Sequence, residues 1–554
     1  MPPAFESHPH LTNLADAFWT WRAVTQPVSG DDIPRLERPA GWVPDWSAEA
    51  VARQRQQLAK FEAEWQKLGA DTHKWSPALQ VDYRLVGCAL ARVRYELDVV
   101  AGWRRNPHFY VHQTLGAVFE LLLPPPPFMP ARTADLVKRA ESIPITVDAA
   151  MANLKDDAVR PFAAMAIAAL QDVRPRMLTV AEELHPWLDP SSAEQFKRAM
   201  ATGARALEAF AAWLETRQET MPVETALGRQ AYADFLQRVA LVPLSPEQVA
   251  AAGQQELARA VAFEALERQR NRHLPPLTLP ANQAEQIARA AAGEDMLRQF
   301  CEAHDLLSFP SWLGHYRNVA LPAYLKPLRG LGVTDDLTSP SRLDEDGICY
   351  IPEPTPDLPY FYAAMARDPR TLIAHEGVHY YQLARSWAQP NPIRRHYYDS
   401  GPNEGIGFYT EEMLLQAGLF DDSPRSREII YNFMRLRALR VAVDVRLALG
   451  ELTIDTAAEV LAHQVPMDLA TAREEASFFA SEPGQAITYQ IGKLQILGFL
   501  SAARLAQADR FNLRAFHDSL VDNGNVPIAL QLWETLGAAD EMRLLDMASD
   551  SLSP

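Results

Sequence analysis

The sequence predicts a mostly α-helical protein with little β structure. Long stretches rich in Ala, Leu, Arg and Glu carry apolar residues three and four positions apart, which is the pattern of an amphipathic helix. The clearest of these stretches are residues 48–68, 77–100, 192–216 and 246–270. Start signals are also present at Ser245-Pro246 and Ser423-Pro424. Ser is favoured at a helix N-cap and Pro at the first helical position.

The chain is long enough for several domains, yet the sequence favours one body. It has 554 residues, of which 48% are hydrophobic and 22% charged, and this is an ordinary globular composition. Its 42 prolines gather between the predicted helices, and no interruption has the Gly/Ser composition of a flexible linker. We therefore expect a single helical domain over residues 1–554. An alternative with two lobes, about 1–280 and about 281–554, stays open.

Charge and cysteine content exclude several classes of function. The net charge of -17 argues against nucleic-acid binding, because that function relies on Lys and Arg to neutralise phosphates. Cys88, Cys301 and Cys349 are far apart and form no Cys-x-x-Cys pair. We therefore expect buried free thiols rather than disulfides or a cysteine-based metal site.

The sequence gives no sign of a membrane or of secretion. The N-terminal residues lack the basic segment and the following apolar segment of a secretory signal. No apolar run approaches the ~18 residues that a membrane span needs. We expect a cytoplasmic protein that does not bind membranes, and the sequence leaves its oligomeric state open.

A helix is expected around one short motif, His375-Glu376-Gly377-Val378-His379. Asp368 suits an N-cap and Pro369 the first helical position, so the helix should run from there to about Ser386. Gly377 inside it costs about 1 kcal/mol relative to alanine. Close packing against a substrate cleft or against another helix would explain that glycine.

The motif predicts a metal site. On a helix, His375 and His379 project from one face, roughly 6 Å apart along the axis, and two imidazoles so placed can bind one metal ion. Glu376 is then placed to act as the general base on a water bound to that metal. The alternative is a pair of exposed or core histidines without a metal.

A third ligand is needed, since a catalytic zinc takes three protein ligands and keeps one position open. Asn403 suits an N-cap, and a helix should follow it to about Ala417. Glu404, 25 residues after His379, is the candidate third ligand. Its alternative is a solvated acid favoured by the helix dipole. Glu411, two turns further on the same face, is a candidate to orient one of the histidines.

The two-histidine, one-carboxylate set favours zinc, one ion per chain, although iron and manganese also suit it. One stretch near the motif has strand character, residues 348–354. Two interpretations of it are open: an edge strand near the metal that pairs with an extended substrate, or a packed irregular connector.

Several segments together resemble a known family. They lie at residues 18–21, 139–144, 374–382, 404–411, 486–493, 516–518 and 524–527. On these segments the chain resembles the bacterial family catalogued as domain of unknown function 885, predicted zinc metallopeptidases. More distantly it is similar to the helical peptidases thimet oligopeptidase and carboxypeptidase Taq. The resemblance implies a metallopeptidase-like body with a central cleft, His375, His379 and Glu404 as metal ligands and Glu376 as base.

The resemblance also implies roles for two later residues, Tyr489 and His517, which match late family motifs. By likeness to the distant peptidases they would stabilise the oxyanion or hold the substrate, and a Tyr hydroxyl or a His N–H is a suitable donor. The alternative for each is a buried aromatic side chain whose polar end is satisfied. The chain departs from the family pattern in three places. Its His-Glu-x-x-His spacing is compact, whereas family members often have a longer gap before the second His. Ile406 stands where the family has a Trp, and the His that the family often has shortly after an Asp is missing after Asp444.

Together these observations predict a zinc-dependent hydrolase that cleaves peptide bonds with Glu376 as general base. By analogy with the distant peptidases its substrates would be short peptides, because a cleft within a helical body limits access. One alternative is a metal-dependent hydrolase of a non-peptide amide or a modified peptide. Another is a catalytically silent helical binding protein, against which the intact Glu376 argues. The sequence does not distinguish endopeptidase from exopeptidase action.

Overall fold

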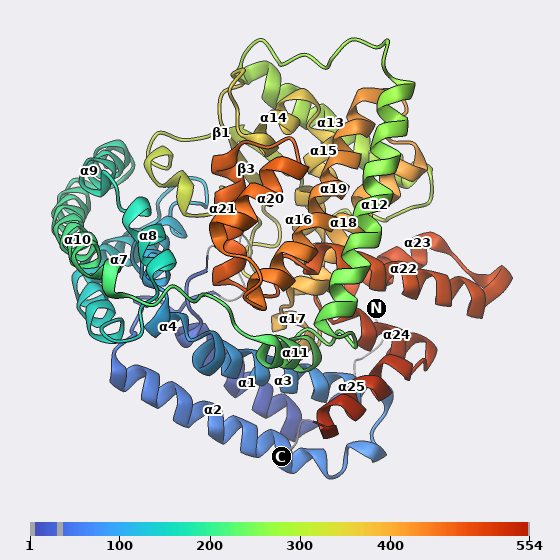
Figure 1. The fold of residues 1–554 in the computed structure, drawn as a ribbon, viewed down its shortest axis with the longest axis horizontal. Coiled ribbons are helices and arrows are strands. Elements are labelled where there is room, and N and C mark those ends of the chain that lie inside the picture. The colour runs from blue at the N-terminus through green and yellow to red at the C-terminus, as the bar shows by residue number, and fades with distance from the viewer. Residues whose placement is uncertain (1–5, 30–36, 552–554) are drawn as a thin grey trace.

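The computed structural model describes residues 6–29 and 37–551 (Figure 1). It is 70% helical with one small three-stranded sheet in the described residues, which confirms the mostly α-helical class. The helices of the first half are α1 (Pro9–Thr25), α2 (Ala48–Gly69), α3 (Pro77–Arg94), α4 (Gly102–Arg105), α5 (Pro107–Val111), α6 (Ala117–Phe119), α7 (Pro130–Asn153), α8 (Arg160–Ala169), α9 (Val173–Leu184), α10 (Pro190–Arg217), α11 (Arg229–Arg238), α12 (Pro246–Arg270) and α13 (Gln283–Ala303).

The second half of the chain holds the sheet and the remaining helices. The strands are β1 (Tyr316–Ala320), β2 (Asp335–Asp336) and β3 (Gly347–Ile351). The helices are α14 (Tyr360–Arg367), α15 (Arg370–Leu372), α16 (Val378–Trp387), α17 (Pro392–His396), α18 (Ser400–Ala417), α19 (Pro424–Ala448), α20 (Ile454–Gln464), α21 (Leu469–Ser481), α22 (Thr488–Gln507), α23 (Leu513–Asp522), α24 (Ile528–Leu536) and α25 (Asp540–Ser551). The four stretches with the clearest helical pattern all form helices, namely α2, α3 with a π-helical continuation, α10 and α12.

Both predicted starts are helix starts, but only Ser245 caps its helix through its side chain, since Ser423 makes no capping hydrogen bond. Ser245 caps α12 through a capping box with Gln248, and Pro424 opens α19 directly after Ser423. These two long helices pack along each other, and Gly253 permits the approach, because a Cβ there would lie 2.6 Å from Cβ of Val441.

Several contacts join helices that lie on opposite sides of residue 280 in the sequence. Helix α12 precedes that point in the sequence, yet it lies against α19. Helices α24 and α25, at the other end of the chain, pack against α3 and α11 (Figure 1). Whether the chain forms one domain or two lobes that meet near residue 280 stays a prediction.

The sheet corrects one hypothesis about the substrate. Its strand order is β1-β3-β2, with β1 parallel to β3 and β2 antiparallel to it. Residues 348–351 of the segment proposed as an edge strand therefore belong to β3, the central strand, and residues 352–354 follow it outside the sheet. The backbone bonds of β3 are used on both sides by the neighbouring strands, so this strand is not free to pair with an extended substrate along its length.

The three cysteines, Cys88, Cys301 and Cys349, are buried free thiols, as predicted. None of the helices within the described ranges is both long and apolar enough to cross a membrane. The cytoplasmic location stays a prediction.

Helices α18 and α22 approach each other through glycines. A Cβ on Gly492 would lie 2.3 Å from the carbonyl oxygen of Gly401 and 2.8 Å from Cα of Gly405. Backbone atoms cannot yield as a side-chain tip can, so this contact between the two helices requires the absence of a Cβ.

We expect Gly492→Ala to lower the free energy of unfolding by about 1–3 kcal/mol, the usual cost of overpacking. Gly498→Ala is the matched control on the same helix, since a Cβ there meets nothing within 4 Å. That variant should gain about 0.4–1 kcal/mol. Denaturant unfolding of both variants measures the difference, and equal stabilities would contradict the close contact.

Candidate metal centre

The His-Glu motif lies in a continuous helical run with an irregular turn. Helix α15 leads into a π-helical segment, Ile373–Gly377, which passes into α16. The predicted helix from Pro369 to about Ser386 is therefore present. Asp368 acts at its start as expected, because its Oδ1 accepts a hydrogen bond from the backbone N–H of Arg370 at 3.1 Å. Single π-helical turns occur often at functional sites.

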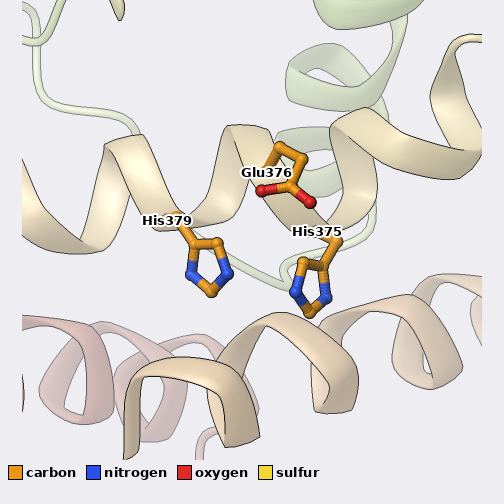
Figure 2. Close-up of side chains that lie close together, drawn as sticks. All are labelled: His375, Glu376 and His379. Atoms are coloured by element: carbon orange, nitrogen blue, oxygen red, sulfur yellow. The ribbon is translucent and has the colours of Figure 1, made fainter. Parts of the chain in front are cut away.

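Both imidazoles of the motif project from the same side of this run (Figure 2). The ring centroids of His375 and His379 are 4.6 Å apart and the ring planes are nearly perpendicular, at 83°. Both side chains are buried, at 2% and 0% exposure. Ligand atoms of these two residues and of Glu376 all lie within 4.8 Å of one another. The three side chains thus form one cluster.

Glu404 approaches the same two rings from α18. Its Oε2 lies 3.1 Å from Nε2 of His375 and 3.4 Å from Nε2 of His379, and the residue is 2% exposed. The alternative of a solvated first-turn acid is therefore wrong. The predicted cap at Asn403 is also wrong, because α18 begins at Ser400 and Asp399 caps it by accepting from the N–H of Gly401 at 2.7 Å.

The two distances from Glu404 Oε2 match the spacing of neighbouring ligands around a tetrahedral metal ion. Zinc with bonds of about 2.0–2.1 Å has neighbouring ligand atoms about 3.3 Å apart, close to the 3.1 and 3.4 Å found here. In addition, Nδ1 of the fully buried His379 has no hydrogen-bond partner in the described residues, and its Nε2 has only the Glu404 carboxylate at 3.4 Å. Buried polar atoms are normally paired. A cation between Glu404 and the two rings would be held by two imidazoles and one carboxylate, a donor set that fits a zinc ion.

Two further charged residues stand behind His375. Oε1 of Glu411 lies 2.7 Å from Nδ1 of His375, and Nη2 of Arg437 lies 2.8 Å from that same carboxylate oxygen. Glu411 is fully buried. The contact with His375 is consistent with the predicted orienting role of Glu411. Arg437 was not among the residues predicted from the sequence. A carboxylate behind an imidazole fixes the orientation of the ring and raises its basicity as a ligand.

Neighbouring charges shift the pKa values of Glu404 and His375 in opposite directions. Burial alone would raise the pKa of Glu404, but His379 and His375 hold it well below its usual range. Burial and Arg437 act to lower the pKa of His375, but Glu404 and Glu411 outweigh them and raise it to about 9. Without a metal, His375 therefore carries a proton at neutral pH. Metal binding has to displace that proton.

Gly407 makes the approach of α18 possible. A Cβ on this residue would lie 2.9 Å from Cε1 and Nδ1 of His375 and 3.0 Å from Cε1 of His379. The glycine lies one helical turn after Glu404, so the helix that supplies the carboxylate rests directly on both rings. No feature of the local sequence distinguishes this glycine from Gly405, which packs against α22 instead.

Glu376 differs from the ligands in its surroundings. It is partly exposed, and its Oε2 is buried without a hydrogen-bond partner in the described residues. Asp335 of β2 is buried nearby and accepts a hydrogen bond from the Tyr316 hydroxyl at 2.6 Å. Burial, and then the charge of Glu376, raise the pKa of Asp335 to about 7. Sequence reasoning missed this acid because the sheet brings it to the motif from forty residues upstream.

At Gly377 an added Cβ would be crowded most by a side chain of the same helical run, and it would meet the sheet only at an ordinary contact distance. A Cβ there would lie 3.1 Å from Cγ2 of Ile373 and 3.5 Å from Cδ1 of Tyr316. The neighbour outside the motif helix is thus strand β1, rather than the substrate cleft or the second helix that the sequence analysis considered.

The two late residues have different surroundings. The Tyr489 ring stacks on His375 with centroids 5.7 Å apart and planes 13° from parallel, and Tyr489 is partly exposed. His517 is buried, with Nε2 at 2.8 Å from the Tyr409 hydroxyl and Nδ1 at 2.6 Å from the carbonyl oxygen of Leu306. Both ring nitrogens of His517 are therefore engaged by the protein, as the alternative interpretation expected. Tyr489 therefore lies at the candidate metal centre, next to His375. His517 has no ring N–H left to donate to a substrate or an oxyanion.

A second acidic cluster has a structural explanation. Glu294, Asp295 and His315 offer ligand atoms close together. However, Glu294 Oε1 accepts from Arg298 at 2.6 Å and from the Tyr381 hydroxyl at 2.7 Å, and its Oε2 lies 2.8 Å from Nδ1 of His315. Both carboxylate oxygens are therefore already bonded, which leaves the His375 centre as the better candidate.

Two solved structures share the fold of this chain. A protein from Shewanella oneidensis described as a "putative lipoprotein of unknown function" matches with a TM-score of 0.71 at 15% identity, over 96% of this chain and 100% of its own. A "putative lipoprotein" from Colwellia psychrerythraea matches with a TM-score of 0.73 at 14% identity, over 97% and 98%. At such identities the likeness shows the fold alone.

A family model also matches most of this chain. The model of a family described as "bacterial protein of unknown function (DUF885)" matches residues 35–531, so the chain belongs to this family, as its motifs predicted. No curated protein matches the chain. Neither the family description nor the two structures assigns an activity, so any activity has to be argued from the site.

Proposed function

We propose that this protein is a zinc-dependent hydrolase that cleaves peptide bonds of short peptides. One observation carries the proposal: a single oxygen of Glu404 lies 3.1 and 3.4 Å from the Nε2 atoms of His375 and His379. Three buried side chains from two helices thus converge on one point, with a fourth, partly exposed acid beside it. Such a set favours zinc over calcium or magnesium, which take oxygen ligands.

His375, His379 and Glu404 would hold the ion. When bound, zinc lowers the pKa of water and polarises a carbonyl group. Glu376 accepts a proton from the attacking water as the water oxygen bonds to the amide carbon, and it delivers that proton to the leaving nitrogen as the carbon–nitrogen bond breaks. The products are a carboxylic acid and an amine. Tyr489, stacked on His375, is placed to contact the substrate or the oxyanion.

Metal analysis and a cleavage screen test this function. The purified protein should contain close to one zinc per chain, and a mixed library of short peptides should be cleaved until a chelator removes the metal. Restored cleavage on adding zinc back would support the proposal. Cleavage that persists after complete removal of the metal would contradict it. Hydrolysis of small amides without any hydrolysis of peptides would favour the alternative substrate class.

Glu404→Ala should lower zinc affinity by more than about 100-fold, because loss of a ligand should exceed the roughly 10- to 100-fold effect typical of a residue behind a ligand. Glu194→Ala, which removes an exposed acid of α10, is the matched control and should bind zinc as the parent does. Competition with a chromophoric chelator measures both affinities. Unchanged affinity in Glu404→Ala would move the third ligand elsewhere.

A further inference from the structure

A short turn leads into the helix that carries Tyr489. Helix α21 ends at Ser481 and α22 begins at Thr488, so Tyr489 is the second residue of its helix. Its ring stacks on His375 with centroids 5.7 Å apart. Residues in the first turn of a helix make fewer backbone hydrogen bonds within it than those that follow. The place of Tyr489 therefore depends on what holds the preceding turn, residues 482–487.

Asp444 of α19 binds the backbone of that turn. Its Oδ1 accepts a hydrogen bond from the N–H of Gly484 at 3.0 Å, and its Oδ2 accepts from the N–H of Ala486 at 2.9 Å and from that of Gly484 at 3.2 Å. Asp444 is 1% exposed. Hydrogen bonds from backbone N–H groups to a buried carboxylate are stronger than those between neutral groups. They hold the turn at two points, five and three residues before Tyr489.

Helix α11 supports this contact. The Tyr232 hydroxyl donates a hydrogen bond to Oδ1 of Asp444 at 3.0 Å, which helps to orient the carboxylate. Gly484 has a φ of +95°, and a Cβ on it would collide with the ring of Phe235. Glycine suits such a backbone conformation and so close an approach. Hydrogen bonds to α19 and packing against α11 thus fix the turn together.

Asp444 lies on the same side of α19 as two residues that reach the candidate metal centre. Arg437 and Arg440 precede it by seven and four positions, which places all three on one helical face. Nη2 of Arg437 lies 2.8 Å from Oε1 of Glu411. The guanidinium carbon of Arg440 lies 4.7 Å from the centroid of the Tyr489 ring. One face of α19 therefore contacts the carboxylate behind a candidate metal ligand, the aromatic ring beside that ligand, and the turn that leads to the ring.

We propose that Asp444 is a positioning residue, which holds Tyr489 at the candidate metal centre by fixing the turn before α22. The inference rests on the proposed function, in which Tyr489 contacts the substrate or the oxyanion. The carboxylate of Asp444 is occupied by the turn and by Tyr232. Its effect on hydrolysis therefore passes through Tyr489.

A double-mutant cycle with Tyr489 tests the inference. Asp444→Asn keeps the shape of the side chain but replaces one acceptor with an amino group, which cannot accept from the turn. We expect it to lower kcat/KM for peptide hydrolysis by about tenfold, the value of one hydrogen bond to a charged group, with zinc content unchanged. In a Tyr489→Ala background the same change should have less than about a twofold effect, since residues that act through one another are not additive. Burial raises the pKa of Asp444 to about 7, so all rates are measured above that pH.

Three results of the cycle would overturn the inference and leave the hydrolase proposal standing. The first is an equal loss of activity in both backgrounds, and the second is no loss when Asp444→Asn is made in the parent. The third is a fully active Tyr489→Ala variant, because Asp444 would then have no residue through which to act. Should Asp444→Asn fail to fold, Tyr232→Phe replaces it. That variant removes only the hydroxyl donor, and its smaller loss of activity should likewise vanish without Tyr489.

A crystal structure of the Asp444→Asn protein is a readout that needs no turnover. The Tyr489 ring should have moved off His375, and a ring still stacked there would overturn the inference. If the parent protein holds no zinc and cleaves no peptide, the hydrolase proposal fails, whereas this structure still tests the contact between the turn and α19.

Asp468→Ala controls for a general loss of stability. Asp468 is the exposed cap of α21, and its Oδ1 accepts a hydrogen bond from the N–H of Thr471 at 2.8 Å. Loss of a cap destabilises a helix. The variant should therefore unfold at a lower denaturant concentration than the parent while kcat/KM stays unchanged. A loss of activity as large as that of Asp444→Asn would mean that reduced stability alone explains the effect, and the inference would fail.

Discussion

Glu376→Gln is expected to reduce hydrolysis by about 10²–10⁴-fold, the range of general acid–base catalysis, while zinc content stays unchanged. The amide has nearly the shape of the carboxylate, but it cannot accept a proton from water. Glu376 is also the partly exposed acid of the cluster, whereas the proposed ligands are buried. Its loss should therefore remove a proton acceptor and leave the metal site intact.

The rate of peptide hydrolysis and the zinc content of the same sample measure this effect. Glu459→Gln, at an exposed position of α20, is the matched control and should behave as the parent enzyme. A Glu376→Gln variant that keeps full activity would refute the assigned base. One that loses its zinc would show that Glu376 is a ligand, as the proximity of its carboxylate to both rings would then allow.

Gly407→Ala is expected to remove zinc binding although it changes no ligand. The added methyl group would lie 2.9 Å from His375 Nδ1 and 3.0 Å from His379 Cε1, closer than carbon atoms approach without a shift. Either the rings turn or α18 moves away and takes Glu404 with it. Both responses separate the three ligand atoms.

Zinc titration and thermal unfolding in the presence and absence of zinc test this effect. Binding of zinc should stabilise the parent protein, by about 2.7 kcal/mol at a concentration 100 times the Kd. The Gly407→Ala variant should lose most of that gain, while Gly498→Ala on α22, where a Cβ meets nothing within 4 Å, should keep it. Zinc-dependent stabilisation of Gly407→Ala equal to that of the parent would contradict the proposed contact between α18 and the rings.

The fold class and the proposed ligands follow from local sequence pattern. Amphipathic spacing and Ser-Pro starts predict helices such as α12 because they describe a single element. The pair His375 and His379 is predicted for the same reason, since a spacing of four fixes two side chains on one helical face. Glu404 is predicted as the third ligand from its position after that motif. Its contact with both rings depends on the packing of α18 on α16, which the local sequence does not determine.

The features that sequence reasoning missed depend on contacts between distant elements. Arg437 resembles an ordinary helix residue until the fold packs α19 against Glu411 and the Tyr489 ring. Asp335 lies near Glu376 only because the small sheet places strand β2 beside the motif. The edge-strand hypothesis failed because strand order is a tertiary property that composition does not encode. The expected cap at Asn403 failed because Asp399 offers a competing cap four residues earlier.

The most direct test of the account is a crystal structure of the zinc-loaded protein with anomalous diffraction data on both sides of the zinc absorption edge. We expect one zinc peak, bonded to the Nε2 atoms of His375 and His379 and to the carboxylate of Glu404. Zinc bound elsewhere, or these three side chains turned away from one another with no metal between them, would contradict it.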